Sequence, residues 1–366
     1  AFDTCNIDIM LKKLHHYGFR DIPLKWFKNY LTGRKQYVEI NGVKSKEKFI
    51  SHGVPQGSIL GPILFLIYIN DFPSATSLFS SLFADDTTIA GKKKELQQGV
   101  EETKKVMSMF EERNNEDKEE EVIFGTDDSG KTRMLGTWLG PKEDINQRLK
   151  RAGNSWRRVK SQLKKSKMSK RKQALVTQAC VESTILFDCQ ARTWQISEIK
   201  RLQQFMDKTF RYIWSRKNQP PLMEMQQKGT NMQDVRSELG VKSIRSKIEK
   251  RVLSRVGHVI RMDDSRMTKQ VTLGWMKELE NWPKLPGKKR KTVLYWRKLI
   301  KEAGLDWTRI GMLTEDRKVW KGLVNERIKH IEEWEKGGGN KSNGEDKLRV
   351  VTEHEGKERS TTPTGK

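Results

Sequence analysis

The sequence predicts an α+β protein, in which a small antiparallel sheet with helices precedes a long, basic, mostly helical region. Three observations support this fold class. Residues 53–62 are punctuated by Gly and Pro and run into a nearly continuous apolar segment at 59–70. Residues 36–42 and 78–90 have the pattern of hairpins. The excess positive charge lies late in the chain, because residues 1–140 hold 19 Lys and Arg against 20 Asp and Glu, whereas residues 141–366 hold 53 against 27.

Composition narrows the class of protein. With 366 residues and 35% hydrophobic content, the chain can form two or three domains. No window approaches the roughly 20 apolar residues that cross a bilayer, so no membrane partner is expected. The three cysteines form no Cys-x-x-Cys pair, which favours a reducing, intracellular setting. A net charge of +25 attracts polyanions, and nucleic acid is favoured over a membrane surface because no amphipathic anchor accompanies the charge.

The first elements are expected to be two helices, a hairpin and a buried helix. Apolar residues recur on one face over residues 7–17, and Gly18 ends that helix. Pro23 begins the second helix, which is expected to turn inward Trp26, Phe27, Tyr30 and Leu31. Residues 36–40 alternate and precede Asn41-Gly42, which indicates a hairpin. The apolar run 59–70 predicts a helix packed under a sheet.

The later elements follow from the same patterns. Residues 78–90 predict strand, turn and strand, with Asp85 and Asp86 at the turn. Residues 96–113 predict a charged helix, and 122–125 and 135–140 predict short strands. Residues 143–215 are expected to be helical, and 235–335 form a second basic region whose tryptophans and His258 should be packed. The tail from residue 337 is poor in apolar residues and should be disordered.

The adjacent carboxylates of Asp85 and Asp86 are candidate metal ligands. A pair of aspartates on a turn is most often merely solvated, but here a hydrophobic strand brings the pair to the tip of a hairpin. Mg²⁺ takes oxygen ligands from one or two carboxylates together with phosphate oxygens. Two such ions can stabilise the attacking and leaving oxygens of a displacement at phosphorus, and a third carboxylate is normally needed to hold both.

The string from Gly53 to Pro62 is the second candidate. Its glycines and prolines fix the backbone shape around Gln56, and glycine lets a ligand approach the backbone closely. A structural turn before a buried helix is the simpler explanation of such a loop alone. The pattern becomes a specific signal of a functional site only when the whole string through Pro73, and its spacing to Asp85-Asp86, are considered together.

These residues, with the upstream string Tyr30 to Val38, resemble the reverse transcriptases of non-LTR (LINE-like) retrotransposons. The resemblance covers residues 1–140 well and 141–215 less sharply, and residues 255–262 resemble a segment of these elements' C-terminal regions. It implies a partial right-hand polymerase palm at 1–140, a basic helical thumb at 141–215, a basic Trp-rich helical region at 216–336 and a disordered tail at 337–366.

The resemblance also implies roles for single residues. Asp85 and Asp86 correspond to the catalytic, metal-binding pair of the palm, with Mg²⁺ or Mn²⁺ as cofactor. Gln56 and Gly57 correspond to groups that touch the incoming deoxynucleotide, and Phe2 to an aromatic under its sugar. Lys118 corresponds, although the match is poor, to a lysine that approaches the triphosphate in related polymerases.

The start of the chain departs from the family. There, the first metal-binding aspartate lies three residues before the Ala-Phe pair, a position that would precede Ala1, and Asp3 is not its equivalent. We therefore expect an N-terminally truncated fragment that lacks the fingers and is inactive, or nearly so, alone.

The basic helices are the third candidate site. Residues 148–172 contain 12 Lys and Arg and no Asp or Glu, whereas a merely solvated helix face would mix signs. Phosphate contacts are therefore expected from the following side chains: Arg148, Arg151, Arg157, Arg158, Lys160, Lys164, Lys165 and Lys167. A second basic string, 284–291, resembles a nucleic-acid-binding or nuclear-localisation patch. The expected locations are nucleus and cytoplasm.

The function that the resemblance implies is that of the C-terminal part of a retrotransposon RNA-directed DNA polymerase. Its partners would be an RNA template, a DNA primer and deoxynucleoside triphosphates, and its chemistry two-metal attack of the primer 3′-hydroxyl on the α-phosphate. The alternative is a non-catalytic, nucleic-acid-binding remnant of a retroelement.

Overall fold

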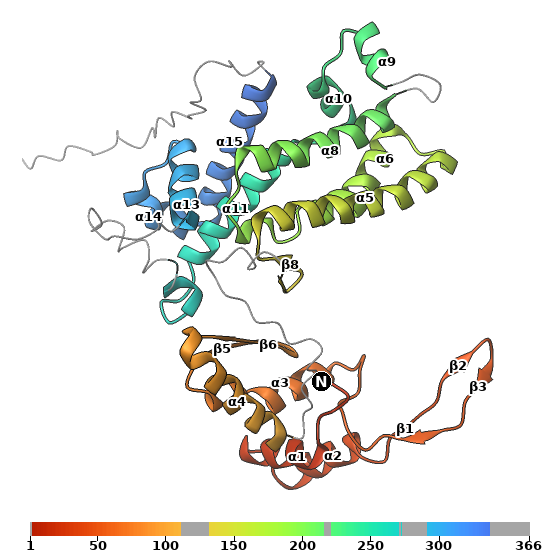
Figure 1. The fold of residues 1–366 in the computed structure, drawn as a ribbon, viewed down its shortest axis with the longest axis vertical. Helices are drawn as coiled ribbons and strands as arrows, with labels where there is room; N and C mark the ends of the chain where they lie inside the picture. Colours follow the sequence, from red (N-terminus) through yellow and green to blue (C-terminus); the bar gives the residue numbers. More distant parts are fainter. Residues whose placement is uncertain (1, 111–131, 216–220, 271, 273–290, 337–366) are drawn as a thin grey trace, which may run out of the picture. The chain divides into compact units, whose positions relative to one another are not determined.

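The computed structural model describes residues 2–110, 132–215, 221–270, 272 and 291–336, and the chain divides into two units, residues 1–135 and 136–366 (Figure 1). Helices and small antiparallel sheets make up the described residues, which confirms the α+β class at this level. The finer domain boundaries at 140, 215 and 336 stay predictions.

The N-terminal unit combines four helices with short strands. Its elements are α1 (Ile7–His16), α2 (Asp21–Leu31), β1 (Lys35–Gln36), β2 (Glu39–Ile40), β3 (Val43–Lys44), β4 (Lys48–Phe49), α3 (Leu60–Ile69), a 3₁₀ turn η1 (Phe72–Ala75), β5 (Phe79–Phe83), β6 (Asp86–Ala90), α4 (Lys93–Met109) and β7 (Arg133–Met134). The expected helices near 7–17 and 96–113 are confirmed as α1 and α4. The expected strand at 122–125 lies outside the described residues, and residues 135–140 give a turn and β8 rather than one strand.

Helix α1 forms where the sequence predicts it because its caps and its apolar stripe agree. The Asn6 side chain accepts hydrogen bonds from the backbone N–H groups of Asp8 (2.8 Å) and Ile9 (3.1 Å), which satisfies two free donors of the first turn. Ile7, Met10 and Leu14 are buried on the inner face. That face packs on α2 and α3 and forms the core of the unit.

Two expectations about burial are wrong in this unit. On α2, Leu31 is buried and Phe27 and Tyr30 pack against the core as expected, but Trp26 is 51% exposed and stacks on Tyr30. On α3, Leu64, Phe65 and Tyr68 are buried against α1, whereas Ile63 and Leu66 on the opposite side are at least half exposed. Among the described residues, helix α3 therefore packs on one face and no sheet covers its other side.

The strands form separate antiparallel pairs. Asn41-Gly42 makes the expected turn between β2 and β3, where both residues have positive φ and Ile40 pairs with Val43. Strands β1–β4 form an arm that extends away from α1 and α2 (Figure 1). Strands β5 and β6 form the predicted hairpin, in which Phe83 pairs with Asp86.

The second unit is helical. Its elements are β8 (Thr137–Trp138), α5 (Pro141–Lys165), α6 (Lys170–Thr177), a π-helical segment η4 (Gln178–Glu182), α7 (Ser183–Ile185), η5 (Cys189–Ala191), α8 (Ile196–Trp214), α9 (Pro221–Gln227), α10 (Met232–Leu239), α11 (Ile244–Ile260), α13 (Lys291–Glu302), η6 (Trp307–Arg309), α14 (Ile310–Glu315) and α15 (Arg317–Lys336). Among the described residues of both units, no helix is long and apolar enough to cross a membrane.

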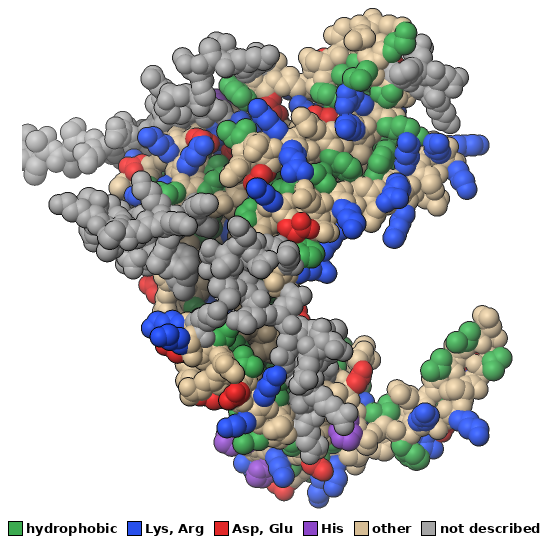
Figure 2. Space-filling view, viewed as in Figure 1, with side chains coloured by type: hydrophobic (Ala, Val, Ile, Leu, Met, Phe, Trp, Pro, Cys, Tyr) green, Lys and Arg blue, Asp and Glu red, His purple; other side chains and the backbone are tan. Residues whose placement is uncertain are grey.

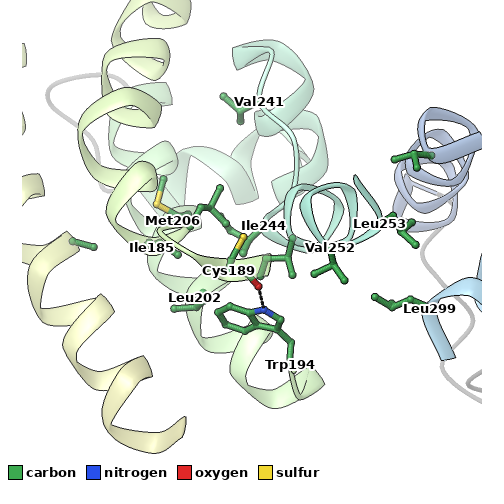
Figure 3. Packing of buried hydrophobic residues seen from close by; sticks show 14 of the residues in the cluster. Ile185, Cys189, Trp194, Leu202, Met206, Val241, Ile244, Val252, Leu253 and Leu299 are labelled. Atoms are coloured by element: carbon green, nitrogen blue, oxygen red, sulfur yellow. Dashed lines mark hydrogen bonds between the residues drawn. The ribbon is translucent and has the colours of Figure 1, made fainter. Parts of the chain in front are cut away.

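Helix α11 lies at the centre of this unit and packs on α8, α13, α14 and α15. Its buried side chains, with those of α5 and α8, form one continuous core (Figure 3). Trp194, Trp214, Trp296 and Trp320 are buried there, as the sequence predicts, and the Trp194 indole donates a 2.7 Å hydrogen bond to the Cys189 carbonyl. His258 is exposed, contrary to expectation, because it lies on the outer face of α11.

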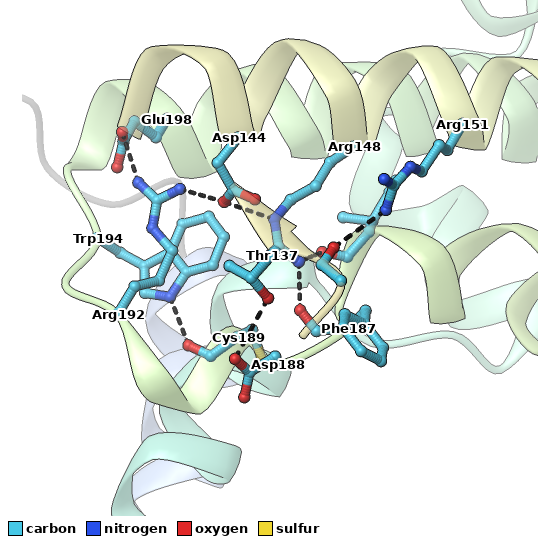
Figure 4. Close-up of polar contacts among 12 residues, drawn as sticks. Thr137, Asp144, Arg148, Arg151, Phe187, Asp188, Cys189, Arg192, Trp194 and Glu198 are labelled. Atoms are coloured by element: carbon cyan, nitrogen blue, oxygen red, sulfur yellow. Dashed lines mark hydrogen bonds and ion pairs between the residues drawn. The ribbon is translucent and has the colours of Figure 1, made fainter. Parts of the chain in front are cut away.

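A buried ion cluster fixes α5 in place (Figure 4). Asp144 and Arg148 are 2% and 4% exposed, and the Arg148 Nε donates a 2.7 Å hydrogen bond to the Asp144 carboxylate. Arg148 Nη1 also donates to the carbonyls of Ile185 (2.9 Å) and Phe187. Arg192 contacts the same carboxylate at 2.5 Å, so α5 is tied to the segment before α8.

Gly257, within the segment 255–262, has a structural role in the contact between α11 and α15. A Cβ at Gly257 would lie 2.2 Å from Trp320 Nε1, and this indole donates a 3.1 Å hydrogen bond to the Leu253 carbonyl. The close approach of α11 to α15 therefore requires a residue without a side chain at this position.

We predict that Gly257→Ala destabilises the protein by about 1–3 kcal/mol, because the added methyl group displaces Trp320 from the core. The matched control is Gly153→Ala on α5, where a Cβ meets no atom within 4 Å and should add up to about 1 kcal/mol through helix propensity. Urea unfolding of both variants measures the difference. Equal stability of the two variants would contradict the packing explanation.

Candidate functional site

The carboxylate pair lies at the tip of the β5–β6 hairpin. Ala84 and Asp85 form its two-residue turn, and Asp86 is the first residue of β6. Ala84 has φ +53°, a left-handed conformation that costs a non-glycine residue on the order of 1 kcal/mol. Asp85 and Asp86 are both exposed. A strained turn thus presents two adjacent carboxylates to solvent.

The donor chemistry of this pair fits a divalent cation. Carboxylate oxygens are the ligands that Mg²⁺ and Mn²⁺ prefer. In the described ranges, however, no group of three or more His, Cys, Asp or Glu side chains is arranged to hold a metal. The pair alone therefore fits one ion completed by water or phosphate oxygens rather than two.

The loop that contains Gln56 is held against the start of the chain. Val54 N–H donates a 2.8 Å hydrogen bond to the Phe2 carbonyl, and Gly53 N–H donates one of 2.8 Å to the Cys5 carbonyl. A Cβ at Gly53 would lie 2.7 Å from Asp3 Cα, and its φ is +83°, so only glycine fits here. The Gln56 amide donates a 2.9 Å hydrogen bond to the Asp3 carboxylate.

Three of the predicted nucleotide-binding residues thus come together, although Lys118 lies outside the described residues. Phe2 stacks on Phe65 of α3 with ring centroids 4.2 Å apart, so the α3 helix supports its ring. Gln56 and Gly57 are exposed beside it, and Gly57 has φ +84°.

Arg34 supports this loop and is missing from the residues singled out above. Its Nε donates to the Leu31 carbonyl at 2.9 Å, and its Nη2 donates to the carbonyls of His52 (3.3 Å) and Gly53. Burial lowers the pKa of the Arg34 guanidinium. Its position in the string Thr32-Gly33-Arg34 could have drawn attention to Arg34. The sequence alone does not indicate which carbonyl groups accept its hydrogen bonds.

The basic residues of α5 divide into two groups. Arg148 is buried in the ion cluster, and Arg151 donates a 3.2 Å hydrogen bond to the Gly136 carbonyl (Figure 4). Lys160 lies over the Tyr212 ring, 4.3 Å from its centroid. The fully buried position of Arg148 corrects the expectation that it contacts phosphate, because its guanidinium neutralises Asp144 instead.

The remaining members of the set are exposed. They are Arg157, Arg158, Lys164, Lys165 and Lys167. Blue side chains line this α5 and α6 side of the helical unit in Figure 2. Lys170 and Lys172 of α6 are exposed on the same part of the chain. Both lie within the stretch 148–172, which has no Asp or Glu. That pattern could have added them to the predicted nucleic-acid-binding residues.

Comparison with known proteins supports the resemblance for the first unit. Residues 1–139 match the family described as reverse transcriptase (RNA-dependent DNA polymerase). The RNA-directed DNA polymerase from mobile element jockey of Drosophila melanogaster is 36% identical over 77 residues, which cover 19% of this chain and 8% of that protein. The probable RNA-directed DNA polymerase from transposon X-element of the same organism is 36% identical over 81 residues, or 20% and 9% of the two chains.

The matched segments therefore cover less than a tenth of the length of these curated relatives. A third relative, the jockey polymerase of Drosophila funebris, is 37% identical over 73 residues. All three relatives are named as RNA-directed DNA polymerases of mobile elements or transposons. Residues 1–139 of this chain are therefore similar to reverse transcriptases, as their resemblance to the polymerases of non-LTR retrotransposons predicts.

Proposed function

We propose that the chain is the palm and thumb portion of an RNA-directed DNA polymerase that extends a DNA primer on an RNA template. The β5–β6 hairpin carries this proposal, because its turn presents Asp85 and Asp86 in the same unit as the loop around Gln56. The family match to residues 1–139 supports the same assignment. Residues 141–215 would then supply the thumb.

The residues of the N-terminal unit take distinct roles in this proposal. Asp85 and Asp86 would hold Mg²⁺ or Mn²⁺, which when bound would stabilise charge on the phosphate oxygens as the primer 3′-hydroxyl displaces pyrophosphate. Gln56 would release Asp3 and contact the sugar and base of the incoming deoxynucleotide. Phe2, supported by Phe65, would lie under the sugar.

The exposed basic residues of α5 would bind the template–primer duplex. Their side chains and those of α6 lie in a stretch of sequence without acidic residues. The electrostatic potential along this surface would therefore be positive throughout and would attract the phosphate backbone. Such contacts position a duplex without reading its sequence.

A second function, nucleic-acid binding without catalysis, is favoured by one observation. The described residues offer two carboxylates at the hairpin and no cluster of three. On this alternative, the basic helices bind nucleic acid and the hairpin holds no catalytic metal.

We predict that Asp85 is essential in a chimera in which residues 1–139 replace the matching segment of the jockey polymerase. Asp85→Asn should lower Mg²⁺-dependent primer extension by more than about 100-fold, close to 3 kcal/mol of activation free energy, because a metal ligand is removed. Binding of the duplex should change little. Asp71→Asn is the matched control, since Asp71 is a surface carboxylate of the same unit that pairs with Lys13 (2.9 Å). Equal activity of the two variants would contradict the catalytic role.

We predict that replacing Lys164, Lys165 and Lys167 by Gln weakens duplex binding by the full chain uniformly across sequences. The slope of log K against log salt should fall by about 0.9 for each phosphate that the variant no longer neutralises. The control replaces Lys318, Lys321 and Lys329, three exposed lysines of α15, with the same change in charge. Equal slopes for both triple variants would show that only net charge matters.

A further inference from the structure

A groove lies between the C-terminal half of α5, helix α6 and the π-helical segment η4. Its volume is about 510 Å³. Apolar and sulfur-containing side chains make up most of its wall, and they are Val159, Leu163, Met168, Val176 and Cys180. Arg158 and Gln162 of α5 add a cation and an amide to the same lining. The groove is thus apolar inside with a few polar groups, as small-molecule sites often are.

The π-helical segment shapes one wall of this groove. Residues 178–182 continue α6 with a wider turn, an irregularity that often occurs at functional sites. Val181 and Glu182 on one side of the segment are buried, and Glu182 pairs with Lys247 of α11 at 2.6 Å. Cys180 lies on the exposed side and faces the groove. Contacts with α5, α6 and α7 and the ion pair to α11 therefore hold the wall in place.

The charge around the groove identifies the kind of occupant. Arg158 lines the groove itself. The same segments of the chain carry further exposed cations, and they are Arg157, Lys164 and Lys165 of α5 and Lys167 of the α5–α6 connection. Between residues 145 and 181 the sequence has no Asp or Glu. An occupant with negative charge at the rim and an apolar, uncharged body fits such a site best.

We propose that this groove binds an unpaired nucleobase of the bound nucleic acid, with the adjoining phosphates at Arg158 and the neighbouring lysines. This inference rests on the proposed binding of nucleic acid by the α5–α6 surface and adds a second kind of interaction to it. The base would lie among Val159, Met168 and Cys180. Gln162 can both donate and accept hydrogen bonds, so it can meet the edge of any base. A repeating row of cations matches a nucleic-acid strand better than it matches one lipid headgroup.

Cys180 provides a direct probe. It is the exposed one of the three cysteines, since Cys5 and Cys189 are buried. The experiment measures the rate at which N-ethylmaleimide alkylates Cys180 in the full chain. One RNA–DNA duplex carries a single-nucleotide bulge, and its matched partner carries an abasic residue at the bulge.

At saturation, the duplex with the bulged base should slow alkylation about fivefold or more, and the abasic duplex less than about twofold. The bulged base should also tighten binding by about five- to tenfold. This gain is near the lower end of base-stacking contributions because no aromatic residue lines the groove.

Two variants test the groove itself. Cys180→Trp fills the groove from an exposed position, and Cys180→Ser keeps its size. The Trp variant should lose the preference for the bulged base and keep its affinity for the abasic duplex, whereas the Ser variant should keep both. Circular dichroism and the unfolding midpoint confirm that both variants are folded.

The outcomes separate the two proposals. If the chain binds neither duplex, the proposed nucleic-acid function fails and the groove assignment fails with it. If it binds both duplexes equally and Cys180 reacts equally, only the groove assignment is overturned. If vesicles of phosphatidylserine and phosphatidylcholine protect Cys180 and the bulged duplex does not, the groove binds lipid and the assignment is overturned.

Discussion

The helical unit depends on one buried carboxylate. Asp144 is 2% exposed and accepts hydrogen bonds from Arg148 and Arg192, while Arg148 also binds two carbonyls at 185 and 187. A charge removed from water costs several kcal/mol unless its partners have good geometry, so few arrangements of α5 and the 185–192 segment are acceptable. The same cluster takes Arg148 out of the basic surface. The exposed positive surface of α5 therefore excludes Arg148 and includes Lys150, Arg157 and Arg158, and this division of charge between the interior and the surface underlies both functions that we assign to α5.

The two candidate elements of the N-terminal unit, the Gln56 loop and the β5–β6 hairpin tip, differ in how firmly the rest of the unit holds them. Backbone hydrogen bonds to Phe2 and Cys5 and the Arg34 guanidinium hold the Gln56 loop, and Gly53 permits the close approach. The hairpin tip, by contrast, is exposed and includes the unfavourable φ of Ala84. Strain at a turn that presents carboxylates is typical of a functional site, since stability alone would favour glycine at that position. The loop is thus held by contacts within the fold, and the hairpin tip presents its carboxylates to solvent.

Local patterns predicted most of the elements, and interactions between distant residues account for the rest. Apolar periodicity located α1 and α4, and turn chemistry located the hairpin at Asn41-Gly42. The hairpin over 78–90 was also predicted, but its turn is Ala84-Asp85 rather than Asp85-Asp86, because Asp86 already pairs with Phe83 as the first residue of β6. Sequence reasoning misplaced the exposed side of α3 because burial depends on what covers a helix, not on its own composition. It also assigned Arg148 to the surface, although Asp144 four residues earlier was a signal for an ion pair. No local pattern indicates that Trp320 would approach Gly257, or that Arg34 would meet the 52–53 carbonyls.

Metal-directed cleavage of the backbone tests the carboxylate assignment most directly. The full chain is incubated with Fe²⁺ in place of Mg²⁺, ascorbate generates hydroxyl radicals at the bound ion, and mass spectrometry locates the cuts. Cuts should concentrate around residues 83–88, diminish as Mg²⁺ is added, and disappear when Asp85 and Asp86 are both replaced by Asn. Cuts that lie elsewhere, or that persist in the double variant, would show that the hairpin binds no metal and would leave the chain as a nucleic-acid-binding protein without this catalytic site.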